Sequence, residues 1–239
     1  MWDNPRLLNA IAGFLTALGV MAFAAAGVHL LLRSPLFPLR EVAVHGALKN
    51  ILREDVERAM QSRISGNFFA ADLGTIRAAL EQLPWVRRVE VRRAWPDRIE
   101  VALEEHIALA RWGSAALVNT HGERFEAASE AVLPLFSGPE GTEREVTRRY
   151  RRFAELAAPL DAALERVTLT PRRSWQIRLA SGLQIELGRD FAQAGGPETR
   201  LARFVAAHPA TLARIARTHE NVDLRYPNGF ALRVPEFKG

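Results

Sequence analysis

The longest apolar stretch of the chain lies close to its N-terminus. No charged residue occurs between Leu7 and Leu32. Residues 11–32 alone would form a helix roughly 33 Å long, at a rise of ~1.5 Å per residue, which is enough to cross the hydrocarbon core of a bilayer. The pattern therefore predicts a transmembrane helix over residues 11–32, preceded by a short tail of residues 1–10.

The same stretch has a second interpretation, as a cleaved secretory signal. Such a signal has an apolar region of only about 7–15 residues, followed by small residues at its cleavage site, and Ala24 to Ala26 offer such a site. The apolar run continues past them, however, through Val28 and residues 30–32. This continuation favours an uncleaved anchor, and a soluble binding module released by cleavage is the alternative.

Residues 39–105 combine strand-like and helix-like patterns. One short alternating segment is followed by two segments with apolar residues at helical spacing, and then by two more alternating segments joined by a turn at 95–98. Asn50 and Asp72 are predicted to cap the two helices, and Pro84 ends the second one. The apolar positions of the five segments are, in order, Leu39, Val42 and Val44; Leu52, Val56, Met60 and Ile64; Leu73, Ile76, Leu80 and Leu83; Val89 and Val91; and Ile99, Val101 and Leu103.

This order, strand-helix-helix-strand-strand, predicts two helices on one face of a small sheet. From residue 106 onward the pattern changes to short strands with a few helices between them. Helices are predicted at 143–160, 197–207 and 211–217, and strands at 108–112, 116–118, 124–126, 133–136, 164–169, 175–179 and 183–187. The predicted fold class is therefore α+β, with a transmembrane helix, a domain over 39–105 and a mixed or antiparallel β domain over 106–235.

The end of the chain carries the main candidate for a binding site. Val222 and Leu224 alternate in one predicted strand, and Phe230, Leu232 and Val234 in the last, with a hairpin turn at 227–229. A last strand at a sheet edge offers unpaired backbone groups to a partner strand; the plainer alternative is that it only completes the sheet. The candidate partner-binding residues of this segment are Arg225, Tyr226, Gly229, Phe230, Ala231, Leu232 and Arg233.

Composition narrows the classes of function. The formal net charge is +5, and almost all basic residues are arginines spread along the chain, without the motifs of a nucleic-acid-binding domain. The chain has no cysteine, which excludes disulfides and thiolate catalysis. Motifs for a serine nucleophile, a nucleotide-binding loop or a histidine metal site are also absent. We therefore predict no catalytic, cofactor-binding or metal-binding residues, and no nucleic-acid partner.

Four segments of the chain carry distinctive motifs. They are Leu-Pro-Trp-Val followed by alternating residues and Ala-Trp-Pro-Asp within 83–112, Arg-Arg-Ser-Trp and its continuation at 172–190, Arg-Leu-Ala-Arg-Phe-Val at 200–205, and Asp-Leu-Arg-Tyr at 223–226. Together these motifs resemble the FtsQ/DivIB family of bacterial division proteins. One departure is Ala108, where the family usually has proline. The resemblance implies that residues 39–105 form a POTRA domain and that the chain assembles other proteins instead of catalysing a reaction.

The resemblance also implies partners and a location. The family binds FtsB, a coiled-coil division protein joined to FtsL, through the segment around 225–233, and an arginine of the turn at 172–174 takes part, so Arg172 and Arg173 are candidates. It implies a single span in the inner membrane at the division septum, with the N-terminus cytoplasmic and the bulk periplasmic. The charges flanking the span do not set this orientation. The alternative is a POTRA-type chaperone of outer-membrane protein strands.

Overall fold

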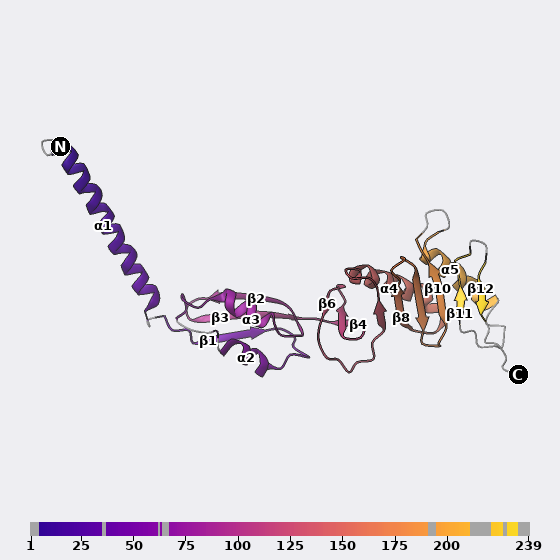
Figure 1. Cartoon of the computed structure of the whole chain (residues 1–239). Coiled ribbons are helices and arrows are strands. Elements are labelled where there is room, and N and C mark those ends of the chain that lie inside the picture. Colours follow the sequence, from indigo (N-terminus) through magenta and orange to yellow (C-terminus); the bar gives the residue numbers. More distant parts are fainter. Residues whose placement is uncertain are drawn as a thin grey trace. The chain divides into compact units, whose positions relative to one another are not determined.

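A computed structural model of the chain describes residues 5–34, 37–61, 63, 67–190, 195–210, 221–226 and 229–233. The chain divides into two compact units, residues 1–105 and 106–239, which are described separately. Figure 1 gives the element labels. The predicted helix at 211–217 lies outside the described residues, as do Ile64, Pro227 and Asn228 of the predicted turn, and Val234 and Pro235.

A single long helix, α1 (Pro5–Arg33), opens the first unit. Within the described residues it is the one helix long and apolar enough to cross a membrane, over Leu8–Leu31, and none of that stretch is buried by protein. The Thr16 hydroxyl donates to the Ala12 carbonyl at 2.8 Å, so this polar group has a partner inside the helix. By its length and composition, α1 fits a single transmembrane span.

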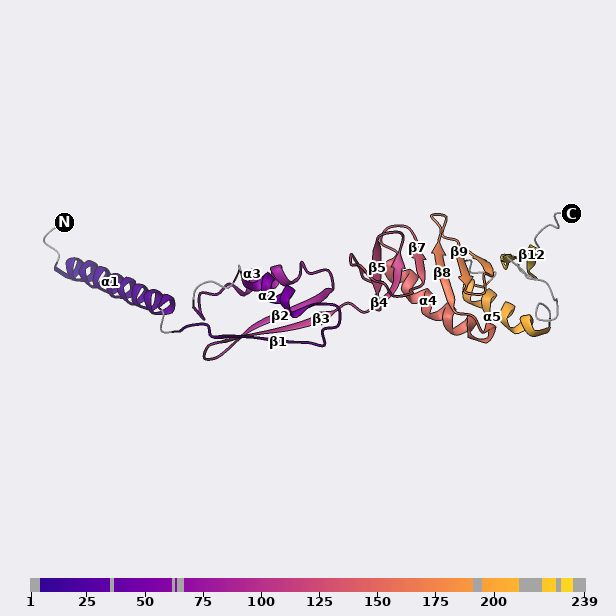
Figure 2. The same cartoon turned by 90° about the horizontal axis from the view of Figure 1, so that it is seen from below.

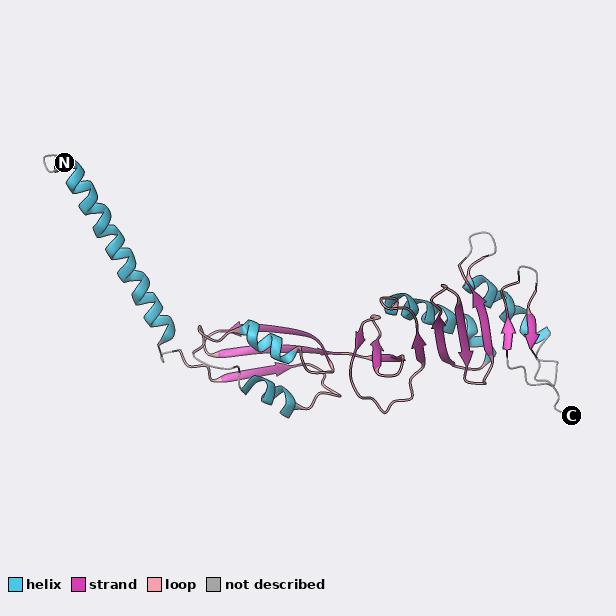
Figure 3. Ribbon diagram, in the orientation of Figure 1, coloured by secondary structure: helices cyan, strands magenta, loops and turns pink. Residues whose placement is uncertain are grey.

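The rest of the first unit has the predicted order. A sheet of three described strands has the order β1-β3-β2, with β1 parallel and β2 antiparallel to β3. Figure 3 shows both helices against this sheet. The elements are β1 (Glu41–His45), α2 (Arg53–Gln61), α3 (Leu73–Leu80), β2 (Val86–Ala94) and β3 (Arg98–Glu105).

Burial of one helix face and one sheet face holds this domain together. The helices contribute Val56, Met60, Ile76 and Leu80 to a core that the strands complete with Val89, Ile99, Val101 and Leu103. Asp72 caps α3 as predicted, because its Oδ1 accepts the Gly74 amide at 2.9 Å. The hydrogen bond from the Thr75 hydroxyl lowers the pKa of this carboxyl below its ordinary value.

Asn50 does not cap α2, contrary to the prediction. The helix begins at Arg53, and the Asn50 amide instead donates to the carboxylate of Glu105 at 3.2 Å. Lys49 and Ile51 donate their amides to the same carboxylate at 2.9 and 3.0 Å. Successive backbone N–H groups form a concave anion site, and here the last residue of β3 supplies the anion. The loop between β1 and α2 is thereby fixed to the end of the sheet.

The second unit is built on one mixed sheet. Its described strands have the order β12-β11-β10-β9-β8-β7-β4-β5-β6, and Figure 2 shows the strands in a second view. The strands are β4 (Ala108–Trp112), β5 (Ala116–Asn119), β6 (Arg124–Phe125), β7 (Leu135–Ser137), β8 (Leu164–Leu169), β9 (Trp175–Leu179), β10 (Gln184–Gly188), β11 (Asn221–Asp223) and β12 (Ala231–Arg233). The observed elements confirm the predicted α+β class.

Helices cover one face of this sheet. They are α4 (Glu143–Ala157), which continues into η1 (Ala158–Leu160), and α5 (Pro197–Ala207), followed by η2 (His208–Ala210). Phe153 of α4 and Phe204 of α5 are fully buried in the same core as Trp175 and Phe136. The opposite face of β8 to β11 carries mainly polar side chains, among them Thr168, Gln176, Glu186 and Asp223, which are partly exposed.

The Glu105 carboxylate generates a prediction about the first unit. Glu105→Ala would leave three amides without their acceptor, so we expect the domain to lose about 1–3 kcal/mol of stability. Amide hydrogen exchange at residues 49–51 should become faster by the corresponding factor. Glu104→Ala is the matched control, because the Glu104 carboxylate pairs with Arg87 at the surface and such pairs contribute about 0–1 kcal/mol. Equal rates of amide hydrogen exchange in both variants would contradict the role of Glu105 as the acceptor for these amides.

Candidate functional site

The last described strand, β12, lies at one end of the sheet. It pairs antiparallel with β11, with Asn221 opposite Arg233 and Asp223 opposite Ala231. On its other side no strand is paired within the described part of the chain. A strand in this position presents a row of backbone donors and acceptors to its surroundings.

Strand β11 joins this end to the rest of the sheet by a parallel pairing with β10. Its Val222 side chain is fully buried. The next residue after the strand, Leu224, is also buried and donates its amide to the Glu186 carbonyl at 2.9 Å. The chain then emerges from the core at Arg225 and Tyr226, which are both exposed.

A two-point ion pair holds Arg225 in place. Its Nε donates to Asp223 Oδ1 at 2.9 Å and its Nη2 to Oδ2 at 2.6 Å. The hydrogen bonds from Arg225 hold the pKa of the Asp223 carboxyl below its ordinary value. The same contact raises the pKa of Arg225. Asp223 lies on β11 beside the edge, so the pair fixes the guanidinium next to β12.

Two adjoining hollows open on the polar face of the sheet near this pair. One has a volume of about 400 Å³ and is lined by β9 to β12; the other, of about 440 Å³, contains one carboxylate, that of Glu186, and four arginines. These are Arg172, Arg189, Arg200 and Arg225. Among the described residues, neither Arg172 nor Arg189 has a carboxylate partner. The excess of guanidinium groups favours an anionic ligand, and arginine prefers carboxylate or phosphate.

The shape of this second hollow depends on Gly188. The pairing of β10 with β9 shifts between Glu186 and Gly188, and Gly188 has a φ of +78°, which favours glycine. A Cβ there would lie 2.9 Å from Arg225 Cγ and 3.1 Å from Arg200 Nη1. Glycine is thus required both for the backbone turn and for the close approach of two arginine side chains.

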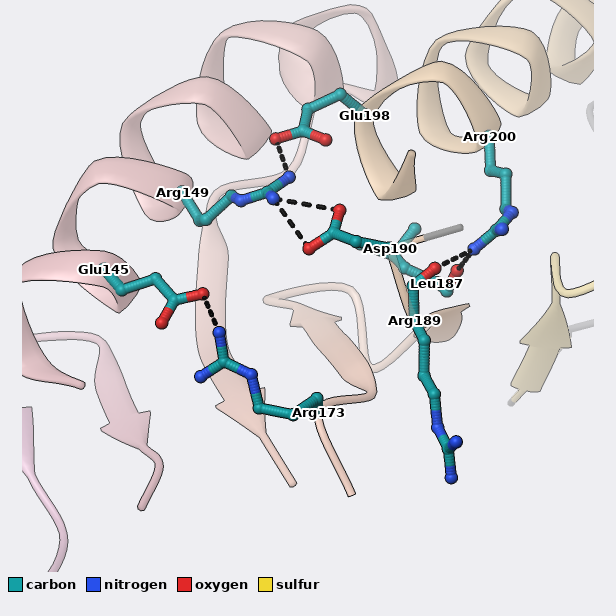
Figure 4. Close-up of polar contacts among 8 residues, drawn as sticks. All are labelled: Glu145, Arg149, Arg173, Leu187, Arg189, Asp190, Glu198 and Arg200. Carbon is teal, nitrogen blue, oxygen red and sulfur yellow. Dashed lines mark hydrogen bonds and ion pairs between the residues drawn. The ribbon is translucent and has the colours of Figure 1, made fainter. Parts of the chain in front are cut away.

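Arg200 supports this turn from the covered side of the sheet. It is only 3% exposed, and its Nη1 donates to the Leu187 carbonyl at 2.6 Å and the Arg189 carbonyl at 2.9 Å. Figure 4 shows the side chain reaching from α5 to both carbonyls. A buried guanidinium is stable only when hydrogen bonds replace its hydration, and here the end of β10 provides them.

A second cluster of ion pairs links α4, α5 and the segment after β10 (Figure 4). Arg149 of α4 donates to both carboxylate oxygens of Asp190, at 2.9 and 2.8 Å, and also to Glu198 of α5. Its guanidinium lies 5.5 Å from the ring centre of Trp175. These contacts fix the start of α5, and with it the position of Arg200.

The two candidate arginines of the turn between β8 and β9 point to different sides. Arg173 has a φ of 62°, and its Nη2 donates to Glu145 of α4 at 2.7 Å, as Figure 4 shows. Arg172 lines the arginine-rich hollow together with Arg225. Of the two, Arg172 is therefore brought together with the C-terminal candidate residues, and Arg173 is engaged with a helix.

The candidate residues of the last segment also differ in their surroundings. Tyr226 is 54% exposed, a Cβ added at Gly229 would meet open space, and Ala231 is exposed and lines the first hollow. Phe230 instead packs perpendicular to Phe204, with ring centres 5.5 Å apart, and Leu232 is half-buried against the core. The backbone of Arg233 pairs with β11, and its side chain lies outside the described residues.

Sequence reasoning missed several residues that form the site. Asp223 had a local signal, because it stands two residues before Arg225 and alternation places both on one face. Gly188 and Arg200 had no such signal, since their contact joins a strand end to a helix. Glu186 and Gln176 belong to the same polar face, and Gln176 Nε2 donates to Glu186 Oε1 at 2.9 Å.

The chemistry that these groups can perform is recognition. Arginines and a tyrosine beside a strand edge can bind an acidic extended peptide. Among the described residues, no group of three or more histidine, aspartate and glutamate side chains could hold a metal ion.

Comparison with known proteins identifies the family. A model described as "POTRA domain, FtsQ-type" matches residues 37–106, and one described as "Cell division protein FtsQ/DivIB, C-terminal" matches residues 110–225. The chain belongs to the FtsQ/DivIB family. The first unit therefore contains a POTRA domain, and membership supports a role in the bacterial division machinery, as the sequence motifs predicted.

Relatives named "Cell division protein FtsQ" match nearly the whole chain. That of Burkholderia pseudomallei is 45% identical, over 98% of this chain and 94% of its own length. That of Nitrosospira multiformis is 40% identical, over 98% of this chain and 99% of its own. That of Escherichia coli is 34% identical, over 82% of this chain and 72% of its own.

The role of the buried Arg200 guanidinium can be tested by replacing the residue with an unbranched apolar one. Arg200→Met would supply an unbranched apolar side chain but leave the buried Leu187 carbonyl and the partly buried Arg189 carbonyl without this donor, at a cost of roughly 2–3 kcal/mol. We expect the melting temperature of the second unit to fall by roughly 5–10 °C. Arg152→Met is the control, because Arg152 pairs with Glu155 on the exposed side of α4. A similarly small effect of both changes would contradict the proposed support of β10.

The ion pair of Asp223 with Arg225 predicts how the stability of the second unit depends on pH. The pKa of this carboxyl is lowered in the folded state, so its contribution to stability is complete above its ordinary pKa and is lost as the pH falls through the lowered value. The difference in melting temperature between the unaltered protein and Asp223→Asn should be constant at neutral pH and shrink in strong acid. A difference that is as large at pH 2 as at pH 7 would contradict this linkage.

Proposed function

We propose that this protein is a membrane-anchored scaffold of the division machinery that binds FtsB, joined to FtsL, by strand addition at β12. The observation that carries the proposal is the position of β12 at the end of the sheet, with its described pairing on one side only. Strand addition uses such an edge for backbone hydrogen bonds and takes its specificity from the neighbouring side chains.

Backbone hydrogen bonds alone are not enough for this binding. The edge strand has three residues, and alternate residues of a strand direct their N–H and C=O groups to the same side. At about 0.5–1.5 kcal/mol for each hydrogen bond, so short an edge contributes only a few kcal/mol. A micromolar dissociation constant corresponds to about 8 kcal/mol, so side-chain contacts must provide much of the affinity.

The exposed side chains beside the edge are suited to this task. Tyr226 offers a large ring with a polar tip, a residue type enriched among the dominant contacts of interfaces. Arg225 is already oriented by Asp223, and Arg172 lines the same hollow. We infer that the bound segment carries acidic side chains that meet these arginines.

We infer that the anchor α1 holds this site at a membrane. In the proposed arrangement α1 crosses the inner membrane once, with residues 1–10 in the cytoplasm and both folded units in the periplasm, at the septum. The protein then acts by holding partners together, which fits a family of division proteins and a site made of recognition groups.

Replacing the exposed Tyr226 gives the most direct test of partner binding at β12. Tyr226→Ala removes a side chain that is 54% exposed, so we expect the melting temperature to stay nearly constant. Affinity for a purified FtsB–FtsL complex should fall by about 2 kcal/mol, or roughly 30-fold, when measured by titration of the full chain in detergent. Phe230 is a poor choice for this purpose, because its ring packs on Phe204.

A control separates loss of the site from a general loss of apolar surface. Ile107→Ala changes a residue that is 66% exposed and precedes β4, which lies six positions from β12 in the strand order. This variant should bind with unaltered affinity. Equal affinities of the unaltered protein and of Tyr226→Ala for the FtsB–FtsL complex would contradict the proposal that the partner binds at β12.

A further inference from the structure

One end of the POTRA sheet carries three aromatic side chains, of which two are exposed and one, Phe37, is partly buried. Phe37 lies just before β1, Phe69 in the loop between α2 and α3, and Trp95 at the tip of the hairpin that joins β2 to β3. Trp95 is 80% exposed and Phe69 is 38% exposed. We refer to Phe37, Phe69 and Trp95 as the aromatic pole. Single exposed apolar residues are ordinary, but three aromatic rings at one end of a small sheet require an explanation.

Hydrogen bonds tie this pole to the residues that directly follow α1. Asn67 Nδ2 donates to the Ser34 carbonyl at 2.8 Å. The Phe68 amide donates to the Phe37 carbonyl at 2.9 Å, and the rings of Phe37 and Phe69 meet edge to face with centres 5.1 Å apart. The loop between the POTRA helices is thus fixed to the end of the membrane helix.

The hairpin tip is tied to the same segment. The Arg40 amide donates to the Asp97 carbonyl at 2.9 Å. The guanidinium of Arg93, two residues before Trp95, crosses to the helix loop and donates to three of its carbonyls, at 2.7 to 3.2 Å. The acceptors are Phe68, Phe69 and Ala71. The backbone of the pole is therefore held in one arrangement.

These bonds limit the distance between the pole and the bilayer. The apolar stretch of α1 ends at Leu31, and the Ser34 amide still donates to the Leu31 carbonyl at 3.1 Å. Three residues at a helical rise of ~1.5 Å span about 5 Å. The polar headgroup zone on each side of the hydrocarbon is roughly 5–7 Å thick. Groups bonded to Ser34 consequently lie at the level of the lipid headgroups when α1 spans the bilayer.

We propose that the aromatic pole binds the lipid surface of the bilayer that anchors α1, with Trp95 and Phe69 inserted at the headgroup level. Tryptophan is enriched at membrane interfaces, because its ring is apolar while its N–H can stay hydrated. The contact would orient the POTRA domain on the membrane. The proposal rests on α1 crossing the bilayer and is independent of partner binding at β12.

Charge is not the driving force of this contact. Three arginines at this end of the sheet are already paired with carboxylates, which offsets much of their attraction to anionic lipids, and Arg93 is bonded to backbone carbonyls of the helix loop. The pairs are Arg40 with Asp97 at 3.8 Å, Arg98 with Glu41 at 3.0 Å, and Arg92 with Glu100 at 2.6 Å. We therefore infer that the ligand is the apolar-polar interface of any fluid bilayer and not a particular anionic headgroup.

The absence of cysteine from the chain allows a direct test with single labels. Trp95→Cys and Phe69→Cys, each carrying an environment-sensitive nitrobenzoxadiazole dye, would be reconstituted as full chains in phosphatidylcholine vesicles. Each label leaves the other aromatic residue in place. We expect a blue shift of the emission, and a loss of intensity when nitroxide lipids labelled near the headgroup are added.

Two further labels serve as controls. Ala47→Cys lies just beyond the opposite end of β1 and should behave as in water, without quenching. Leu18→Cys lies within the apolar stretch of α1 and should be quenched by deep nitroxide lipids. Quenching at 18 without quenching at 95 and 69 would overturn the lipid contact, whereas no quenching at 18 would overturn the span and the proposal with it.

The same labelled proteins are also measured in vesicles of different lipid composition and after addition of a protein partner. Equal quenching in neutral vesicles and in vesicles with phosphatidylglycerol supports an apolar contact, and quenching in the anionic vesicles alone overturns it. A blue shift at 95 that appears only when purified FtsB–FtsL complex is added, with no lipid quenching, would assign the pole to a protein partner instead.

Discussion

The parallel pairing of β11 with β10 is the interaction on which the C-terminal end of the sheet depends. It covers three positions, 184–186 with 221–223, and β12 has β11 as its single described neighbour. Hydrogen bonds in so short a ladder contribute about 1 kcal/mol each. Burial of Val222 and Leu224 contributes roughly 1.5–3 kcal/mol for each side chain, so packing under the sheet holds the edge in place at least as much as the ladder.

The same strand, β10, also shapes the recognition surface. Its ladder ends at Gly188, where the chain turns away and lets Arg200 and Arg225 approach the backbone from two directions. Arg200 comes from a helix whose start is fixed by the ion pairs of Arg149. Edge and hollow therefore share one structural support, and a change in the core under β10 will alter both.

Alternation and helical spacing predicted most elements of the two folded units, because most of these strands and helices bury one face. The limits of β4, β8, β9 and α5 coincide with the predicted ones. Contacts between distant segments have no corresponding pattern in the sequence. Three such contacts depend on tertiary structure: the bond from the Asn50 amide to Glu105, the parallel pairing of β10 with β11, and the different directions of Arg172 and Arg173, the second of which has a left-handed backbone. The pairing of β12 beside β11 was predictable from alternation and the hairpin turn, and the hollow beside it was not.

A short edge and a membrane anchor complement each other energetically. In the proposed complex, the three residues of β12 would give a partner strand few hydrogen bonds, so recognition would have to draw on Tyr226 and on arginines from two separate turns. Tethering would reduce the affinity that these contacts must supply in that complex, because two chains held at one membrane meet at a high effective concentration, up to the millimolar range for short tethers. A lipid contact that restricts the orientation of the POTRA domain would raise that effective concentration further. The anchored chain would then adopt fewer arrangements in which a partner cannot contact β12.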